Sequence, residues 1–249
     1  MAVKSIREIK EEFKQIPPEK LPEYMDLYRD DSRKGVQDFL KTQENRMKKY
    51  EAELVRIEEL CSFEKKYSDY SYICGVDEVG RGPLAGPVVA GAVILPKDCR
   101  ILYINDSKQL SPGKRQELYQ VIMEKAVAVG VGYASCARID EINILQATYE
   151  AMRKAIASLS VEPSLLLNDA VTIPAVGIPQ VAIVKGDARS ISIGAASIVA
   201  KVYRDRMMEE YDKMYPGSNK GYGSKEHIEA LHRMGPCPLH RRSFLKSIL

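Results

Sequence analysis

The chain has few cysteines and no spacing that would pair them. Its 249 residues include five, an odd number without any C-x-x-C pair: Cys61, Cys74, Cys99, Cys136 and Cys237. A disulfide framework and a thiolate zinc site both need regularly spaced cysteines, so the sequence argues against either. Scattered cysteines of this kind are typical of proteins from a reducing cytosol.

Long apolar runs are also missing. The longest, from Leu84 to Leu95, is interrupted by Gly86, Pro87 and Gly91 and is too short to cross a bilayer. The first residues lead directly into a charged amphipathic segment, without an apolar signal region. We therefore expect a cytoplasmic protein that does not insert into a membrane.

Neither sign of charge dominates, and histidine is scarce. The formal net charge is +3, with 15 Lys and Arg against 16 Asp and Glu in residues 1–71 and 22 against 18 in residues 72–249. A mildly basic C-terminal part fits a protein that follows a phosphate backbone and fits an ordinary solvated surface equally well. Three histidines lack metal-ligand spacing and are interpreted as surface groups or as groups that support a site from behind: His227, His232 and His240.

Residues 1–71 are expected to form a helical extension. Ser5 is suited to cap a first helix that ends at Pro17-Pro18 and whose apolar face holds Ile6, Ile9, Phe13 and Ile16. A short helix is expected over residues 21–28, and one long helix over residues 33–66 carries a heptad-like seam of Leu40, Met47, Tyr50, Leu54, Ile57 and Cys61. Two interpretations stay open: a hairpin that packs on its own catalytic domain, or an arm that binds nucleic acid or a partner.

From residue 72 the pattern changes to strands that alternate with helices. Strands are expected over residues 72–76, 88–95, 130–137, 164–167 and 181–184. Helices are expected over residues 112–129, 139–159, 188–215 and 224–234. The first two strands flank a glycine-rich turn, which favours a hairpin. The alternation predicts an α/β domain over residues 72–249, with helices packed on a mixed sheet.

Three of the expected strands end on carboxylates. The acids are Asp77 and Glu78 after the first strand, Asp169 after the fourth and Asp187 after the fifth. Acids beside an apolar core lose hydration and repel each other, so they usually persist only with a cation. If the strand ends are neighbours, four carboxylates share a site for two Mg²⁺ or Mn²⁺ ions, which suits phosphodiester hydrolysis. Taken singly, Asp187 could instead be a helix N-cap and Asp169 a turn residue.

Other polar residues fall in loops that a substrate could reach. Gly80-Arg81-Gly82 offers backbone N–H groups and a guanidinium, both suited to phosphate oxygens. Lys108 is a candidate phosphate contact, although most single lysines are simply solvated. Tyr222 stands between two glycines, so it is interpreted as stacking on a sugar or base, or else as covering an apolar edge.

Six separate stretches resemble the bacterial ribonuclease HII family, the type 2 ribonucleases H. They are residues 75–87, 106–111, 169–170, 185–190, 195–205 and 221–227, in this order. The resemblance implies an RNase H-like fold with a mixed five-stranded sheet flanked by helices and with C-terminal helices. It implies that the four acids form the catalytic and metal-binding centre. The segment 1–71 is similar to the extension of Bacillus-type members.

The resemblance also implies the reaction and its substrate. A family member hydrolyses the RNA strand of RNA–DNA hybrids and incises 5′ of single ribonucleotides in duplex DNA, giving 3′-hydroxyl and 5′-phosphate ends. Gly80, Arg81 and Gly82 would contact the phosphates and the 2′-hydroxyl at the junction, and Tyr222 would stack on the following sugar. Two departures are small: Val79 stands where Ala is usual, and Asn168 where an apolar residue is common.

Two other readings compete with this one. The sibling enzyme ribonuclease HIII carries a different glycine-rich sequence where this chain has Gly80-Arg81-Gly82, which favours HII. A catalytically silent binding module is disfavoured because all four acids are present. The expected partners are RNA–DNA hybrids and ribonucleotide-containing duplex DNA. We expect a monomer, and a replication clamp is left open without support from the sequence.

Overall fold

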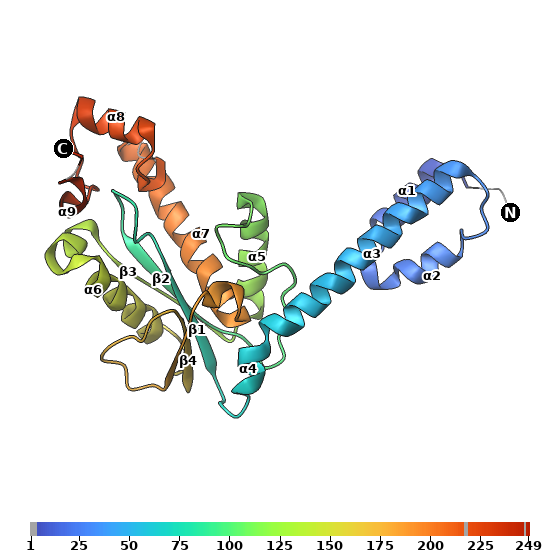
Figure 1. Cartoon of the computed structure of the whole chain (residues 1–249), viewed down its shortest axis with the longest axis horizontal. Coiled ribbons are helices and arrows are strands. Elements are labelled where there is room, and N and C mark those ends of the chain that lie inside the picture. Colours follow the sequence, from blue (N-terminus) through green and yellow to red (C-terminus); the bar gives the residue numbers. More distant parts are fainter. Residues whose placement is uncertain (1–3, 217–218, 247) are drawn as a thin grey trace. The chain divides into compact units, whose positions relative to one another are not determined.

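A computed structural model describes residues 4–216, 219–246 and 248–249 (Figure 1). The chain divides into two compact units, Met1–Glu58 and Glu59–Leu249. Among the described residues, no helix has the length and apolar character needed to span a membrane.

The first unit is a small all-helical cluster. It contains α1 (Ile6–Lys14), η1 (Pro18–Lys20), α2 (Leu21–Asp26) and most of α3 (Lys34–Leu60). The Ser5 cap is confirmed, because its hydroxyl accepts from the Glu8 N–H while the Glu8 carboxylate accepts from the Ser5 N–H at 2.6 Å. Phe13 lies in the core and meets the Phe39 ring edge-on, with centroids 5.2 Å apart.

The single long helix expected over residues 33–66 is wrong at its C-terminal end. α3 stops at Leu60, Cys61 leaves the helical conformation with ψ at 4°, and the short α4 (Ser62–Lys66) follows. The break allows Phe63 to pack on the buried apolar cluster of the second unit. The expected seam is also interrupted, since Leu54 is 39% exposed while Ile57 and Cys61 are buried.

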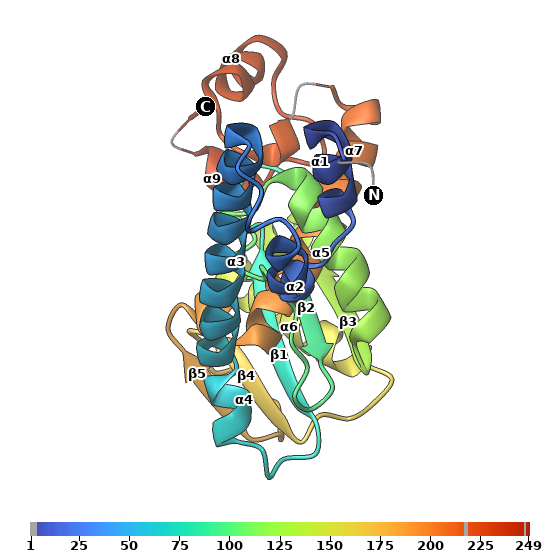
Figure 2. The ribbon, with the colours of Figure 1, turned by 90° about the vertical axis from the view of Figure 1, so that its right-hand side faces the viewer.

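The second unit is built on a mixed sheet of five strands. These are β1 (Ile73–Val79), β2 (Val88–Ile94), β3 (Ala128–Ala134), β4 (Leu165–Asp169) and β5 (Gln180–Ile183). The order across the sheet is β3-β2-β1-β4-β5, which Figure 2 shows from edge to edge. The β1–β2 and β2–β3 pairs are antiparallel, whereas β4 runs parallel to both β1 and β5. The predicted hairpin and the predicted fold class are confirmed.

Helices cover both faces of this sheet (Figure 1). α6 (Cys136–Ala157) packs on β2 and β3, and α7 (Ile191–Met214) packs on β1 and β2. The alternation along β2 explains this arrangement, because Ala90 and Ala92 belong to the core under α6, whereas Val89 packs with Ala200 of α7. A Cβ on Gly91 would lie 2.5 Å from a carbonyl oxygen of α7, so glycine lets this helix approach closely.

The remaining helices surround this core. α5 (Pro112–Lys125) begins at the expected Ser111 cap and packs against α7. The short η2 (Gly186–Ala188) precedes α7, and η3 (Asn219–Gly221), α8 (Lys225–Met234) and α9 (Arg242–Leu245) follow it. Strand β3 begins at Ala128, inside the helix expected over residues 112–129, because α5 already ends at Lys125.

Candidate active site

Two of the four predicted acids lie within a strand rather than after it. β1 continues to Val79, so Asp77 and Glu78 are part of the ladder and pair with Gly91 and Ala90 of β2. Asp77 is 5% exposed, and its carboxylate accepts from the Glu78 N–H at 2.7 Å. The acids stay in the strand because β2 provides backbone partners for them.

The other two acids approach from the neighbouring strands. Asp169 is the last residue of β4, which is parallel to β1, and its carboxylate accepts from the Gly186 N–H at 2.7 Å. Asp187 lies in η2, after Lys185 in a left-handed conformation with φ at +55°. The N-cap of α7 is Ser190, so the alternative interpretation of Asp187 as a helix cap is wrong.

The pKa shifts show that these carboxyls share one region. Burial is the largest cause in each case and raises the pKa of Asp77, Glu78 and Asp187. The charge of Asp169 raises the pKa of the same three groups further. The four acids come from separate parts of the chain. The charge of Asp169 can act on the other three only because the fold places the four close together.

The site also includes an acid and two hydroxyls that sequence reasoning did not single out. The charge of Asp106 is the second cause, after burial, that raises the pKa of Asp187. Ser197 of α7 donates to Ser107 at 2.9 Å, and both side chains are buried. Asp106 and Ser107 lie in residues 106–111, one of the stretches that resemble the family. This resemblance was the sequence signal that could have pointed to them.

The donor set suits a hard divalent cation. Glu78 Oε2 is buried without a hydrogen-bond partner among the described residues, which is an unusual state for a carboxylate oxygen. Oxygen ligands with raised pKa, gathered beside an apolar core, are the groups that a divalent cation neutralises. Among the described residues, however, no group of three or more His, Cys, Asp or Glu side chains has the arrangement of a metal-binding site.

The predicted phosphate contacts border the acids. Arg81 is exposed, and its Nη1 donates to Glu78 Oε1 at 3.1 Å. Gly82 is exposed as well, whereas Gly80 is buried with φ at +89°. Lys108 is exposed, and its charge lowers the pKa of Glu78 and of Asp187 against the larger effect of burial.

Two cationic side chains lie over the ring of Tyr222. Its ring is 40% exposed, and Lys201 Nζ and the Arg204 guanidinium lie 5.5 and 5.6 Å from the ring centroid. Two of the three histidines are buried, His227 and His240, and His232 is exposed. His227 Nδ1 lies 2.8 Å from the Tyr222 carbonyl oxygen, so this histidine supports the Tyr222 loop from behind.

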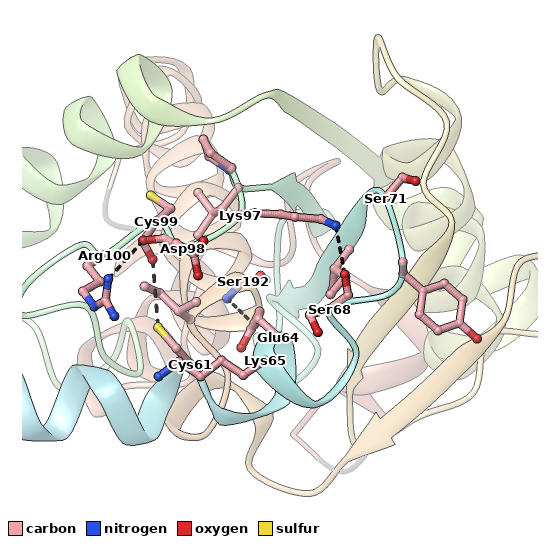
Figure 3. A pocket seen from close by; sticks show the side chains of 15 residues that line it. Cys61, Glu64, Lys65, Ser68, Ser71, Lys97, Asp98, Cys99, Arg100 and Ser192 are labelled. Carbon is pink, nitrogen blue, oxygen red and sulfur yellow. Dashed lines mark hydrogen bonds between the residues drawn. The ribbon is translucent and has the colours of Figure 1, made fainter.

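A separate pocket of about 410 Å³ lies away from these groups. Its walls come from α4, the start of β1, residues 95–100 and the start of α7 (Figure 3). None of the nine predicted site residues lines it. The candidate site is therefore the acid centre with its bordering loops.

Comparison with solved structures identifies the class. Ribonuclease H2 from Pyrococcus horikoshii OT3 superposes with a TM-score of 0.60 at 29% identity, over 71% of this chain and 96% of that one. RNase HII from Archaeoglobus fulgidus, solved in a complex with PCNA, gives 0.59 at 25% identity, over 69% and 94%. The fold is therefore RNase H-like, the fold of the type 2 ribonucleases H.

Sequence comparison narrows the class to one family. The ribonuclease HII family matches residues 74–247, and the ribonuclease HII N-terminal domain matches residues 5–68. Ribonuclease HII of Clostridioides difficile is 51% identical with full coverage of both chains, and that of Lachnoclostridium phytofermentans is 66% identical over 90% of this chain and 89% of its own. The Bacillus licheniformis enzyme is 47% identical over 98% and 97%. The chain belongs to the ribonuclease HII family, and it is an endoribonuclease.

Proposed function

We propose that the protein cleaves the RNA strand of RNA–DNA hybrids and incises duplex DNA on the 5′ side of a single embedded ribonucleotide, leaving 3′-hydroxyl and 5′-phosphate ends. One observation supports this most. The acid pair and the phosphate-binding turn are parts of one short stretch, joined by the contact between Glu78 and Arg81. The acids proposed for hydrolysis therefore lie next to the groups suited to bind phosphates at an RNA–DNA junction.

Asp77, Glu78, Asp169 and Asp187 are proposed as the catalytic residues and as the ligands of two divalent cations, Mg²⁺ or Mn²⁺. When bound, such a pair activates the attacking water and stabilises the leaving oxygen. The protein's part is to keep carboxylates buried and close, so that their mutual repulsion is relieved by cations. Glu78 has an unpartnered oxygen ready for this role.

Gly80, Arg81, Gly82, Lys108 and Tyr222 are proposed as the substrate-binding residues. Arg81 and Lys108 are exposed cations beside the acids, so they can contact phosphates next to the scissile bond. The half-exposed Tyr222 ring can stack on a sugar, while backbone groups of the turn meet the 2′-hydroxyl that distinguishes RNA from DNA.

We also propose a monomer that acts in the cytoplasm, and we keep residues 1–71 as the proposed extension. The relative from A. fulgidus was solved with PCNA, which keeps a sliding clamp open as a partner of this chain. Size-exclusion chromatography with and without the sliding clamp of the source organism tests both the monomer and the clamp.

The central experiment is incision by the Asp77→Asn variant. Asparagine keeps the shape but removes one charge from the acid centre, so we expect turnover to fall by about a thousandfold on a single-ribonucleotide duplex and on an RNA–DNA hybrid. Hybrid binding should stay close to wild type. The control is Asp98→Asn, which changes an exposed acid of the same domain.

Each contrary outcome has a definite meaning. Unchanged turnover of Asp77→Asn would show that these acids are not the catalytic centre. Absence of cleavage by the wild-type protein would support a silent binding module. Good cleavage of long hybrids without incision at single ribonucleotides would instead point to the specificity of the sibling enzyme.

A further inference from the structure

Two arginines, Arg204 and Arg241, are completely buried beneath the proposed substrate-binding loops. Both side chains are 0% exposed. In the part of the chain that the structure describes, neither forms an ion pair with a carboxylate, although buried charges are normally paired. Burial lowers the pKa of both guanidinium groups, that of Arg241 to about 10, and the charge of Arg204 lowers the pKa of Arg241 further. So costly an arrangement needs a reason.

The guanidinium of Arg241 donates its hydrogen bonds to carbonyls of the loop that follows the acid pair. Its Nη1 donates to the Arg81 carbonyl at 2.9 Å and its Nη2 to the Gly80 carbonyl at 2.5 Å. Its Nε and Nη2 both donate to the Gly86 carbonyl, at 2.9 and 2.7 Å. One planar group therefore fixes both ends of the loop from Gly80 to Gly86.

Arg204 connects the same loop to the segment that carries Tyr222. Its Nε and Nη2 donate to the carbonyls of Pro87 and Ala85 at 3.0 and 3.1 Å. Its Nη1 donates to the Lys220 carbonyl at 3.1 Å, and its guanidinium lies under the Tyr222 ring. The two loops thus share one rigid support.

Backbone contacts complete this junction between loops. The Leu84 N–H donates to the Gly221 carbonyl at 2.8 Å, and the Arg241 N–H donates to the Leu84 carbonyl at 2.9 Å. Two glycines make room for it, because a Cβ on Gly80 would lie 2.4 Å from Arg204 Nε, and one on Gly221 would lie 2.1 Å from the Ala85 carbonyl oxygen. Both glycines also have positive φ, at +89° and +84°.

We propose that Arg204 and Arg241 are positioning residues for substrate specificity: they set the distance between the Gly80–Gly82 turn and Tyr222, and so the preference for a single ribonucleotide followed by DNA. The inference rests on the proposed function of these two loops. A guanidinium is required because a lysine has the charge but cannot span several carbonyls with a planar set of donors. An ordinary structural role would instead affect all substrates alike.

The test is a comparison of Arg241→Lys, Arg204→Lys and wild type on two substrates. One is duplex DNA with a single ribonucleotide, and the other is a hybrid with an all-RNA strand. We measure kcat/KM for both and follow folding by circular dichroism and thermal unfolding. The matched control is Arg242→Lys, since Arg242 is the exposed neighbour of Arg241.

We expect each lysine variant of a buried arginine to lower the ratio of the two kcat/KM values by about tenfold, because a small displacement of a binding loop is enough for such a loss. Cleavage of the all-RNA strand should change far less, and Arg242→Lys should behave as wild type. Two variants are used so that the result does not depend on one that folds poorly.

Three outcomes would overturn the inference, and they are distinguishable. If wild type prefers the single ribonucleotide and the folded variants keep the same ratio, the arginines do not set specificity. If both substrates lose the same factor, the arginines serve stability alone. If wild type shows no incision at a single ribonucleotide, the proposed function itself fails, and this inference with it.

Discussion

Two buried histidines fix the backbone beneath Tyr222 through a chain of hydrogen bonds. The Tyr222 carbonyl can only accept, so His227 Nδ1 must carry a proton. In a neutral His227, Nε2 then accepts from His240 Nε2–H, 2.9 Å away, which leaves His240 Nδ1 to accept from the Cys237 N–H at 3.0 Å. This pair of neutral tautomers satisfies these three contacts, whereas the Cys237 carbonyl oxygen, 3.3 Å from His240 Nδ1, receives no proton from the ring in it.

This chain of hydrogen bonds predicts that the protein loses stability in mild acid. Burial lowers the pKa of His240 below its usual value of 6.5, and the neighbouring His227 and the Cys237 backbone are the groups that face its ring. The folded state therefore binds fewer protons than the unfolded chain in this range. The stability that comes from keeping His240 neutral is fully present above pH 6.5. It is lost as the pH falls below that value toward the lowered pKa of His240.

We expect thermal unfolding to shift to lower temperature between pH 7.5 and pH 5.5, and to shift less in His240→Gln than in wild type. The difference arises because the folded wild type binds fewer protons at His240 than the unfolded chain, and glutamine does not titrate. His232→Gln changes an exposed histidine of α8 and is the control. Equal pH dependence of wild type and His240→Gln would contradict the lowered pKa of His240 as its cause.

At the scale of elements, the start of α7 is held by Glu64, a residue more than 100 positions earlier in the sequence. Glu64 of α4 accepts from the Ser190 hydroxyl at 2.6 Å. It also accepts from the Ser192 N–H at 3.1 Å, a contact drawn in Figure 3. Ser190 is the N-cap of α7, and Asp187 lies three residues before it. Glu64 therefore fixes the helix end that positions the fourth acid.

We expect Glu64→Ala to lower kcat by about tenfold and to raise the Mg²⁺ concentration needed for half-maximal activity, because Asp187 loses its support. The free energy of unfolding should fall by about 1 to 3 kcal/mol through the unpaired donors. Glu64→Gln keeps one acceptor oxygen and should recover most of the activity. Asp69→Ala, at an exposed acid nearby, is the control; equal effects of the alanine and glutamine variants would contradict the argument.

The sequence could predict the strands of this site but not its turns. Apolar runs located all five strands, and Asp169 falls at the end of β4 as expected, whereas β5 ends at Ile183 and Asp187 follows it in η2. The position of Asp187 could not be predicted, because it depends on a left-handed Lys185 and on Glu64, which no local pattern reveals. Arg204 and Arg241 were missed for a similar reason, since arginines are read as surface residues until packing shows them buried.

At the scale of the whole molecule, the boundary of the extension is the feature that the sequence leaves least determined. Composition and the strand pattern place it after residue 71, and this stays a prediction. The compact units divide after Glu58, whereas the family's N-terminal domain matches residues 5–68. The difference concerns α4, whose Phe63 packs with Leu165 and Ile193 in the second unit. Tertiary packing of this kind is invisible to composition.

Two truncations separate these boundaries. Removing residues 1–58 leaves Glu64, Phe63 and the rest of α4 in place, so we expect the shortened protein to fold and to keep its kcat. Removing residues 1–71 exposes apolar core and deletes the Glu64 acceptor, so we expect a loss of about 2 to 5 kcal/mol in the free energy of unfolding and a lower kcat. Thermal unfolding and incision of a single-ribonucleotide duplex measure both effects. Equal behaviour of the two truncations would contradict the role of α4, while a raised KM with unchanged kcat in the shorter truncation would favour an extension that binds nucleic acid.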